Sequence, residues 1–85
     1  MTLTQEEENM EQAFKDEMHL KLLQKSTEKL SWLNPSIETE DLFIKFTEEI
    51  GEVFVEGANP NGNSISLKRE LIDVANLAMM LWSRL

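Results

Sequence analysis

The sequence predicts an all-α protein of three to four helices, forming one domain over residues 1–85. Three observations support this prediction: apolar residues recur at helical spacing, capping patterns open the segments, and Pro or Gly residues separate them. The chain contains no cysteine, so neither a disulfide nor a thiolate metal site is available. A chain of 85 residues buries a modest core, and assembly with further copies is a common remedy.

The first predicted helix opens on Thr4-Gln5-Glu6-Glu7, which has the pattern of a capping box. Apolar residues that share one helical face follow it: Met10, Phe14, Met18, Leu22, Leu23 and Leu30. We expect this stripe to belong to the core. The helix can run to about Leu30 or Trp32 before Asn34-Pro35 stops it, and a break at Ser26-Thr27 would divide it in two.

The second predicted helix is capped by Thr39 and closed by Gly57. Its expected apolar face consists of Phe43, Phe46, Ile50, Val53 and Phe54. The third helix begins at Asn63 or Ser64 and runs almost to Leu85. From Leu71 onward it is apolar on nearly all sides, and such a helix belongs in the centre of an assembly. We therefore expect a homodimer or homotetramer in which the helices of several chains form one bundle.

The charge and hydropathy of the chain exclude some partners. A formal net charge of −8 argues against binding a nucleic-acid polymer, which requires clustered Lys and Arg. No apolar stretch reaches membrane-spanning length, so we expect no membrane partner. The N-terminus lacks a basic segment followed by an apolar run. We therefore expect a cytoplasmic protein without a secretory signal.

Two pairs of acids carry the most information about function. Glu49 and Glu52 are three residues apart, as are Glu70 and Asp73, and residues at this spacing share a helix face. If the chain folds back at the turn Gly57–Asn63, Glu52 lies opposite Glu70 and Glu49 lies opposite Asp73. Four carboxylates held so close repel one another unless a cation neutralises them, and all-oxygen ligation suits Mg²⁺ or Mn²⁺. The sequence therefore predicts a metal site.

Other chemistries fit these residues less well. Carboxylate-bridged di-iron bundles use Glu-x-x-His motifs, and the single histidine, His19, lies outside both acid pairs. The turn 59–63 lacks the acids of a calcium loop. There is neither a serine nucleophile elbow nor a phosphate-binding glycine loop.

The run Glu48-Glu49-Ile50-Gly51-Glu52, followed after seventeen residues by Glu70-Leu71-Ile72-Asp73, resembles the EExxE…ExxD pattern of MazG-like nucleotide pyrophosphohydrolases. The continuation from Asp73 to Met80 is similar to a small bacterial and phage-type branch of that family. The resemblance implies a single MazG-like helical domain that assembles as dimers or dimers of dimers. It also implies Mg²⁺-dependent hydrolysis of (deoxy)nucleoside triphosphates to a monophosphate and pyrophosphate.

By position, the resemblance makes Glu49, Glu52, Glu70 and Asp73 the metal ligands. Glu48 is then a further ligand or a group that orients water, and either Glu48 or Glu49 accepts the water's proton. Lysines of the first helix, Lys21, Lys25 and Lys29, are candidates for contacting phosphates, although an exposed lysine on a helix is equally common.

The remaining candidate substrate-binding residues are Trp32 and Asn76. Trp32 either stacks on the base or caps the core, and Asn76 either bonds a ribose hydroxyl or supports Asp73. The alternative to an enzyme is a catalytically silent helical module that binds a nucleotide or another protein. In that case the apolar third helix serves assembly and the acids form an exposed patch.

Overall fold

A computed structural model describes residues 1–26 and 36–85, and these residues form three α-helices without a strand. Helix α1 spans Gln5–Ser26, α2 spans Thr39–Ala58 and α3 spans Ser64–Arg84. The all-α prediction is therefore confirmed for this part of the chain. The expected continuation of the first helix to Leu30 or Trp32 lies outside the described residues.

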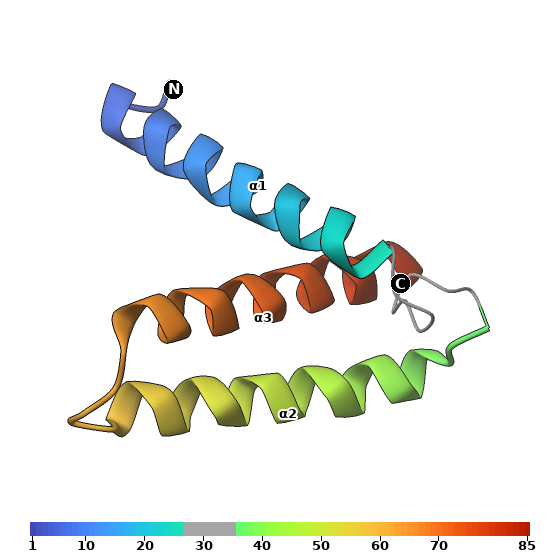
Figure 1. The fold of residues 1–85 in the computed structure, drawn as a ribbon. Helices are drawn as coiled ribbons and strands as arrows, with labels where there is room; N and C mark the ends of the chain where they lie inside the picture. The colour runs from blue at the N-terminus through green and yellow to red at the C-terminus, as the bar shows by residue number, and fades with distance from the viewer. Residues whose placement is uncertain (27–35) are drawn as a thin grey trace.

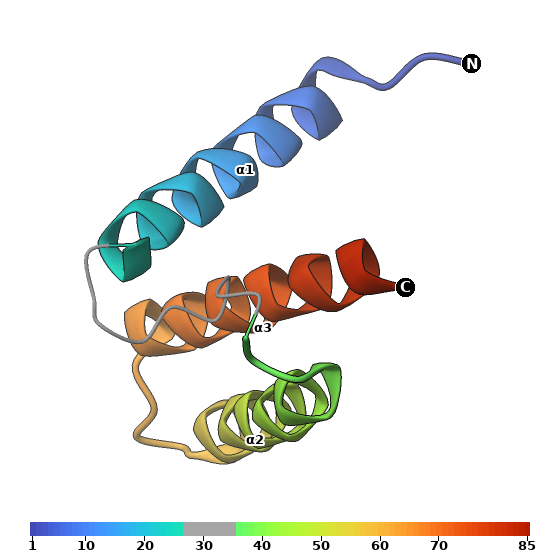
Figure 2. The same ribbon diagram turned by 90° about the vertical axis from the view of Figure 1, so that its right-hand side faces the viewer.

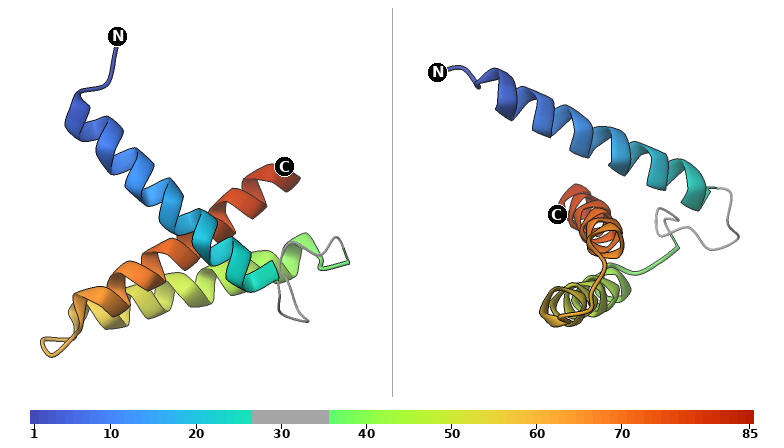
Figure 3. Two further views of the ribbon diagram at one scale, coloured as in Figure 1. Left: turned by 45° about the horizontal axis from the view of Figure 1, so that its top comes forward. Right: turned by 60° about the vertical axis from the view of Figure 1, so that its left-hand side comes forward.

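Helix α3 lies between the other two helices. α2 and α3 run antiparallel and side by side, joined by a short turn, whereas α1 crosses α3 on the side away from α2 (Figures 1 and 2). The crossing involves only the C-terminal part of α1, and its N-terminal part extends away from both other helices (Figure 3). The hairpin of α2 and α3 is thus the packed unit of the chain, and α1 is attached to one side of it.

Two of the predicted helix starts are confirmed by their hydrogen bonds. The Glu7 backbone N–H donates to Thr4 Oγ1 at 3.2 Å, and the Thr4 N–H donates to Glu7 Oε1 at 2.9 Å, which is the reciprocal pair of a capping box. At the start of α3, the Ile65 N–H donates to Asn63 Oδ1 at 2.8 Å. Each of these bonds satisfies a backbone donor that has no partner inside the helix.

The predicted limits of α2 are wrong at both ends. Thr39 is the first helical residue, and Glu38 takes the N-cap position without a side-chain hydrogen bond. Gly57 does not close the helix, because α2 continues to Ala58 with Asn59 as its C-cap. None of the described glycines has a positive φ, so the left-handed ending that favours glycine is not used here.

The turn after α2 is held by local hydrogen bonds and requires a glycine. The Gly62 N–H donates to the Asn59 carbonyl at 2.9 Å, and the Asn63 N–H donates to Glu56 Oε1 at 3.2 Å. A Cβ at Gly62 would lie 2.7 Å from the Glu56 carbonyl oxygen and 2.8 Å from that of Asn59. Because both atoms belong to the backbone, a larger residue would have to displace the turn that joins α2 to α3.

The core is small and lies between α2 and α3. Leu42 is fully buried and packs with three buried residues of α3, which are Leu77, Met80 and Leu81. Leu22, Ile37 and Phe46 pack against this cluster and are partly buried. The Arg84 guanidinium donates to the Ile37 carbonyl and ties the end of α3 to the segment before α2. This end of the hairpin is therefore the more firmly packed one.

The expectation that the α1 stripe is core is wrong for Met10, Phe14 and Leu23, whereas Leu22 packs against the core and Met18 is partly buried; Leu30 lies outside the described residues. No residue of α1 is buried, and Met10, Phe14 and Leu23 are 69%, 43% and 52% exposed. The expected face of α2 is also partly wrong, because Phe43 and Phe54 are exposed. The physical reason is geometric: a helix that touches its neighbour only near one end leaves the rest of its apolar stripe without a covering surface.

Helix α3 also keeps part of its apolar surface in solvent. Leu71, Met79 and Trp82 are exposed, with Trp82 at 79%. Within residues 1–26 and 36–85, no helix combines the length and the hydropathy needed to cross a bilayer.

Candidate metal centre

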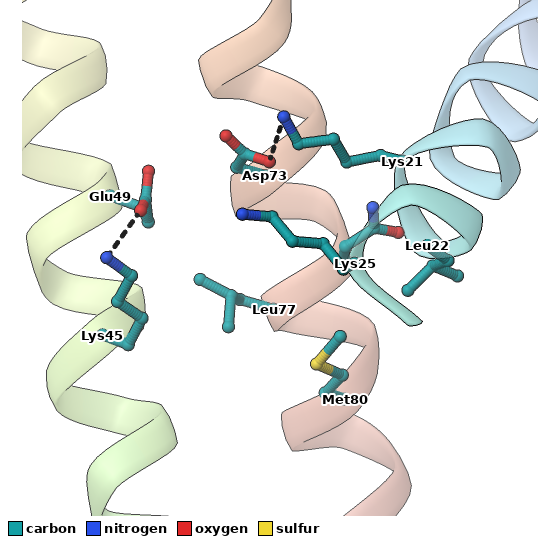
Figure 4. A pocket seen from close by; sticks show the side chains of 9 residues that line it. Lys21, Leu22, Lys25, Lys45, Glu49, Asp73, Leu77 and Met80 are labelled. Carbon is teal, nitrogen blue, oxygen red and sulfur yellow. Dashed lines mark ion pairs between the residues drawn. The ribbon is translucent and has the colours of Figure 1, made fainter. Parts of the chain in front are cut away.

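Three carboxylates from two helices converge in the middle of the hairpin. Glu49 comes from α2, and Glu70 and Asp73 come from neighbouring positions on one face of α3. One oxygen atom of each residue lies within 4.8 Å of the corresponding atoms of the other two. Figure 4 shows Glu49 and Asp73 facing the gap between α2 and α3 from opposite sides. A single cation between the helices would be within reach of all three side chains.

The oxygens of this cluster are poorly satisfied by the protein itself. Glu49 is only 7% exposed, and its Oε2 has no hydrogen-bond partner among the described residues. Within the same residues, Glu70 Oε2 is likewise buried without a partner. A buried carboxylate oxygen without a donor is costly, and such groups are normally paired or bound to a metal. The cluster therefore has the properties of a site that a cation completes.

Lysines neutralise part of the negative charge. Lys45 Nζ lies 3.1 Å from Glu49 Oε1 and 3.8 Å from Glu48 Oε2, both within α2. From α1, Lys21 Nζ lies 3.6 Å from Asp73 Oδ1. Figure 4 shows these two lysines approaching the cluster from different helices. The hydrogen bond with Glu49 is also the main cause that raises the pKa of Lys45, so this ammonium is firmly charged.

Crowding of the acids changes their affinity for protons. Burial, together with hydrogen bonds shared with Glu52 and Glu49, raises the pKa of Glu70 from 4.5 to about 7. Two carboxyl groups share a hydrogen bond only when one of them carries a proton, and Glu70 takes up that proton as the pH falls through about 7. Burial also raises the pKa of Asp73, although the positive charge of Lys21 opposes this.

The pKa of Glu49 shifts in the opposite direction, downward. Burial alone would raise the pKa of its carboxyl, but hydrogen bonds with Lys45, Glu52 and Glu70 outweigh burial and lower it. Glu49 therefore stays ionised to a lower pH than Glu70, whose pKa is about 7. Carboxyl groups whose environments separate their pKa values in this way are typical of functional sites.

A cavity of about 120 Å³ adjoins the cluster between all three helices. It is lined by Lys21, Leu22, Lys25, Lys45, Glu49, Asp73, Asn76, Leu77 and Met80. The Asn76 amide donates to the Met18 carbonyl of α1 at 3.3 Å, whereas its Oδ1 is buried and has no partner within the described ranges. The cavity is smaller than the roughly 300 Å³ at which pockets for drug-sized ligands begin. It has room for an ion and a few waters, not for a nucleoside.

The other predicted ligands lie beside this triad. Glu52 is exposed and is not one of the three converging acids, although it is close enough to affect the pKa of Glu49 and of Glu70. Glu48 is also exposed and, with Glu52 and Glu70, lines an open groove on the hairpin. Two predicted substrate-binding residues, Lys29 and Trp32, lie outside the described residues.

The sequence interpretation missed Lys45. The residue is four positions before Glu49, and an acid and a base at this interval on a helix regularly pair. That signal was available, but it does not distinguish an ordinary surface ion pair from one made to a buried carboxylate. Only the burial of Glu49 in the hairpin gives Lys45 its significance.

Comparisons with protein-family models, with curated proteins and with solved structures return no match to this chain.

Proposed function

We propose that this chain is a Mg²⁺- or Mn²⁺-dependent hydrolase that converts (deoxy)nucleoside triphosphates to a monophosphate and pyrophosphate. The observation that supports the proposal most directly is the convergence of Glu49, Glu70 and Asp73, two of which have a buried oxygen without a partner among the described residues. The reaction itself is suggested by the resemblance of the acidic motif to that of MazG-like pyrophosphohydrolases.

The donor set fits the proposed ion. All three converging atoms are carboxylate oxygens, the hard ligands that Mg²⁺ and Mn²⁺ prefer. Glu52, which lies next to Glu49 and Glu70, is a further candidate ligand. When bound, a divalent ion supplies neutralisation of phosphate charge and activation of a water molecule.

Several side chains of the chain have roles in this proposal. Glu48 and Glu49 are the two candidates for accepting a proton from water: Glu49 belongs to the buried cluster, and Glu48 is exposed beside it. Lys21 and Lys25 line the cavity from α1, where they are placed to attract phosphate groups. Asn76 joins α3 to α1 through Met18, and its buried Oδ1 has no partner among the described residues. Because the cavity it lines is too small for a nucleoside, we favour a supporting role beside Asp73 over a bond to a ribose hydroxyl.

The proposed enzyme works as an oligomer in the cytoplasm. The cavity is too small for a nucleoside, so we infer that the base lies outside it. Lys29 and Trp32, which lie outside the described residues, stay candidates for contacting the nucleotide from the sequence alone. The exposed apolar side chains of α3, Leu71, Met79 and Trp82, favour burial against a second copy. We infer that a homodimer or homotetramer covers this surface and supplies walls for the nucleotide pocket.

The test is the Asp73→Ala variant, measured with a panel of nucleoside triphosphates and Mg²⁺ by separate assays for pyrophosphate and orthophosphate. We expect pyrophosphate release by the wild type and a loss of at least about 100-fold in the variant, because one metal ligand is removed. Circular dichroism should remain helical. Asp16→Ala, which removes an exposed acid of α1, is the matched control and should keep its activity.

Two outcomes would contradict the proposal. Full activity of Asp73→Ala would mean that the reaction does not depend on the carboxylate cluster. Orthophosphate as the sole product would mean that a different bond of the triphosphate is cleaved. Stabilisation of the fold by Mg²⁺ without turnover of any triphosphate would instead support the catalytically silent module. A melting scan with and without Mg²⁺ makes that comparison, since a specifically bound ion stabilises the folded state by mass action.

A further inference from the structure

Lys45 holds one oxygen of the most buried acid in the cluster. Its Nζ lies 3.1 Å from Glu49 Oε1, closer than Lys21 Nζ is to Asp73. The other oxygen of Glu49, Oε2, is buried and has no partner among the described residues. Glu49 is therefore half-satisfied: a resident ammonium holds one oxygen, and the second oxygen remains available to a ligand.

We propose that Lys45 sets the affinity of the cluster for divalent ions, because its ammonium must leave Glu49 when such an ion binds there. The proposal rests on the metal site put forward above and deepens it. Lys45 acts through Glu49, so it is a positioning residue and not a catalytic one.

The structure provides a place for the displaced ammonium. Lys45 Nζ already lies 3.8 Å from Glu48 Oε2, three residues along the same helix. The Glu48 side chain is 61% exposed and is not among the three converging acids. Rotation of the Lys45 side chain toward Glu48 would therefore keep an ion pair while it frees Glu49, with no movement of the α2 backbone. The Lys45 side chain is 29% exposed, so part of it already borders solvent.

The expected change in divalent-ion affinity on removal of the Lys45 charge follows from Coulomb repulsion. A dication bound at Glu49 would lie within a few ångströms of the Lys45 ammonium, and the two repel each other even with solvent-like screening. Removing the lysine charge removes both this repulsion and the competition for Glu49. On the Coulomb scale for partly solvated charges, we expect affinity to rise by roughly tenfold.

The experiment measures Mn²⁺ binding by electron paramagnetic resonance in the full chain. Lys45→Met should bind Mn²⁺ about tenfold more tightly than the wild type, and Lys45→Arg, which retains the charge, should bind no more tightly than the wild type. The matched control is Lys15→Met, which removes an exposed lysine that pairs with Glu11 four residues earlier in α1. Its affinity should equal that of the wild type.

A second measurement uses the wild-type chain and does not depend on the folding of any variant. Acetylation of lysines, read by mass spectrometry, should be faster at Lys45 with Mn²⁺ than without it, whereas acetylation of Lys15 should not change. A purely structural role for Lys45 would lower stability in Lys45→Met without tightening Mn²⁺ binding or changing this labelling.

Failure of the role proposed for Lys45 can be distinguished from failure of the proposed metal site. If the wild type binds Mn²⁺ but Lys45→Met binds it equally or more weakly, and labelling of Lys45 is unaffected by the ion, the role of Lys45 is refuted and the metal site stands. If neither chain binds Mn²⁺, the metal site and the inference both fail.

Discussion

Replacing Glu70 with Gln should make the metal-free protein more stable at alkaline pH. Burial and the neighbouring carboxyls of Glu52 and Glu49 raise the pKa of Glu70 from 4.5 to about 7. A carboxyl whose pKa is raised by folding favours the folded state while it is protonated. Its contribution is fully present below pH 4.5 and is lost as the pH rises through about 7. A glutamine has the shape of the protonated acid at every pH, so it avoids this loss.

The magnitude follows from the two pKa values. Each pKa unit corresponds to about 1.36 kcal/mol, so the change from 4.5 to about 7 sets an upper limit of about 3.4 kcal/mol. Glu70 is only partly buried, and water screens part of its repulsion from Glu52 and Glu49. We therefore expect Glu70→Gln to increase the free energy of unfolding by about 1 to 2 kcal/mol at pH 8, and to have little effect at pH 4.5.

Urea unfolding in the presence of EDTA, followed by circular dichroism at pH 4.5 and pH 8, measures this difference. With a urea dependence of about 1 kcal/mol per molar, typical of small proteins, the midpoint at pH 8 should rise by about 1 to 2 M. Glu11→Gln is the control, because it removes an exposed acid with a lysine partner, and such pairs contribute less than about 1 kcal/mol. Added Mg²⁺ should stabilise the wild type and leave Glu70→Gln nearly unchanged.

Equal or lower stability of Glu70→Gln at pH 8 would refute the reasoning, since the Glu70 carboxylate would then not be crowded in the folded state. An equal gain at both pH values would also contradict it, because the gain would come from packing and not from ionisation. The control separates these results from a general effect of net charge.

Three further predictions address binding, assembly and the turn. Mn²⁺ affinity of the wild type should rise about tenfold between pH 6 and pH 8, as Glu70 loses its proton through a pKa of about 7. An Mn²⁺ affinity that does not change with pH in titration calorimetry would contradict this. Trp82→Glu places a charge on a side chain that is 79% exposed in the protomer and should shift sedimentation to monomers; an unchanged oligomer would exclude this surface from the interface. Gly62→Ala should destabilise by about 1 to 3 kcal/mol in urea, whereas Gly51→Ala, where a Cβ meets nothing within 4 Å, should be neutral or stabilising by up to about 1 kcal/mol. Equal effects of the two glycine variants would refute the steric argument.

The parts of the fold that depend on neighbouring residues could be predicted from the sequence. The capping box of Thr4 and Glu7 and the cap at Asn63 involve contacts over two or three residues, so their patterns carry the needed information. The start of α2 was misplaced because Thr39 is the better capping residue by type, whereas the structure places Glu38 there. The capping preference of a residue type does not decide where a helix starts when other contacts hold the segment before it.

Burial could not be predicted in the same way. Helical spacing shows that Met10 and Phe14 share a face, but it does not show whether another element covers that face. The same limit applies to the candidate site. Acids three residues apart were visible in the sequence, whereas the opposite pKa shifts of Glu49 and Glu70 depend on burial and on the neighbours that each carboxyl meets in the hairpin. The involvement of Lys45 depends on the same burial.

The N-terminal part of α1 extends away from the other two helices, and this arrangement has a consequence for amide hydrogen exchange. Every residue from Gln5 to Glu17 is exposed, so this stretch has only its own backbone hydrogen bonds and side-chain pairs to hold it helical. Isolated helices of about this length are marginal in water. In a dilute protomer, deuterium should therefore enter these amides within the shortest labelling times, long before it enters those around Leu77. Slower uptake at higher protein concentration would map where a second chain lies along α1.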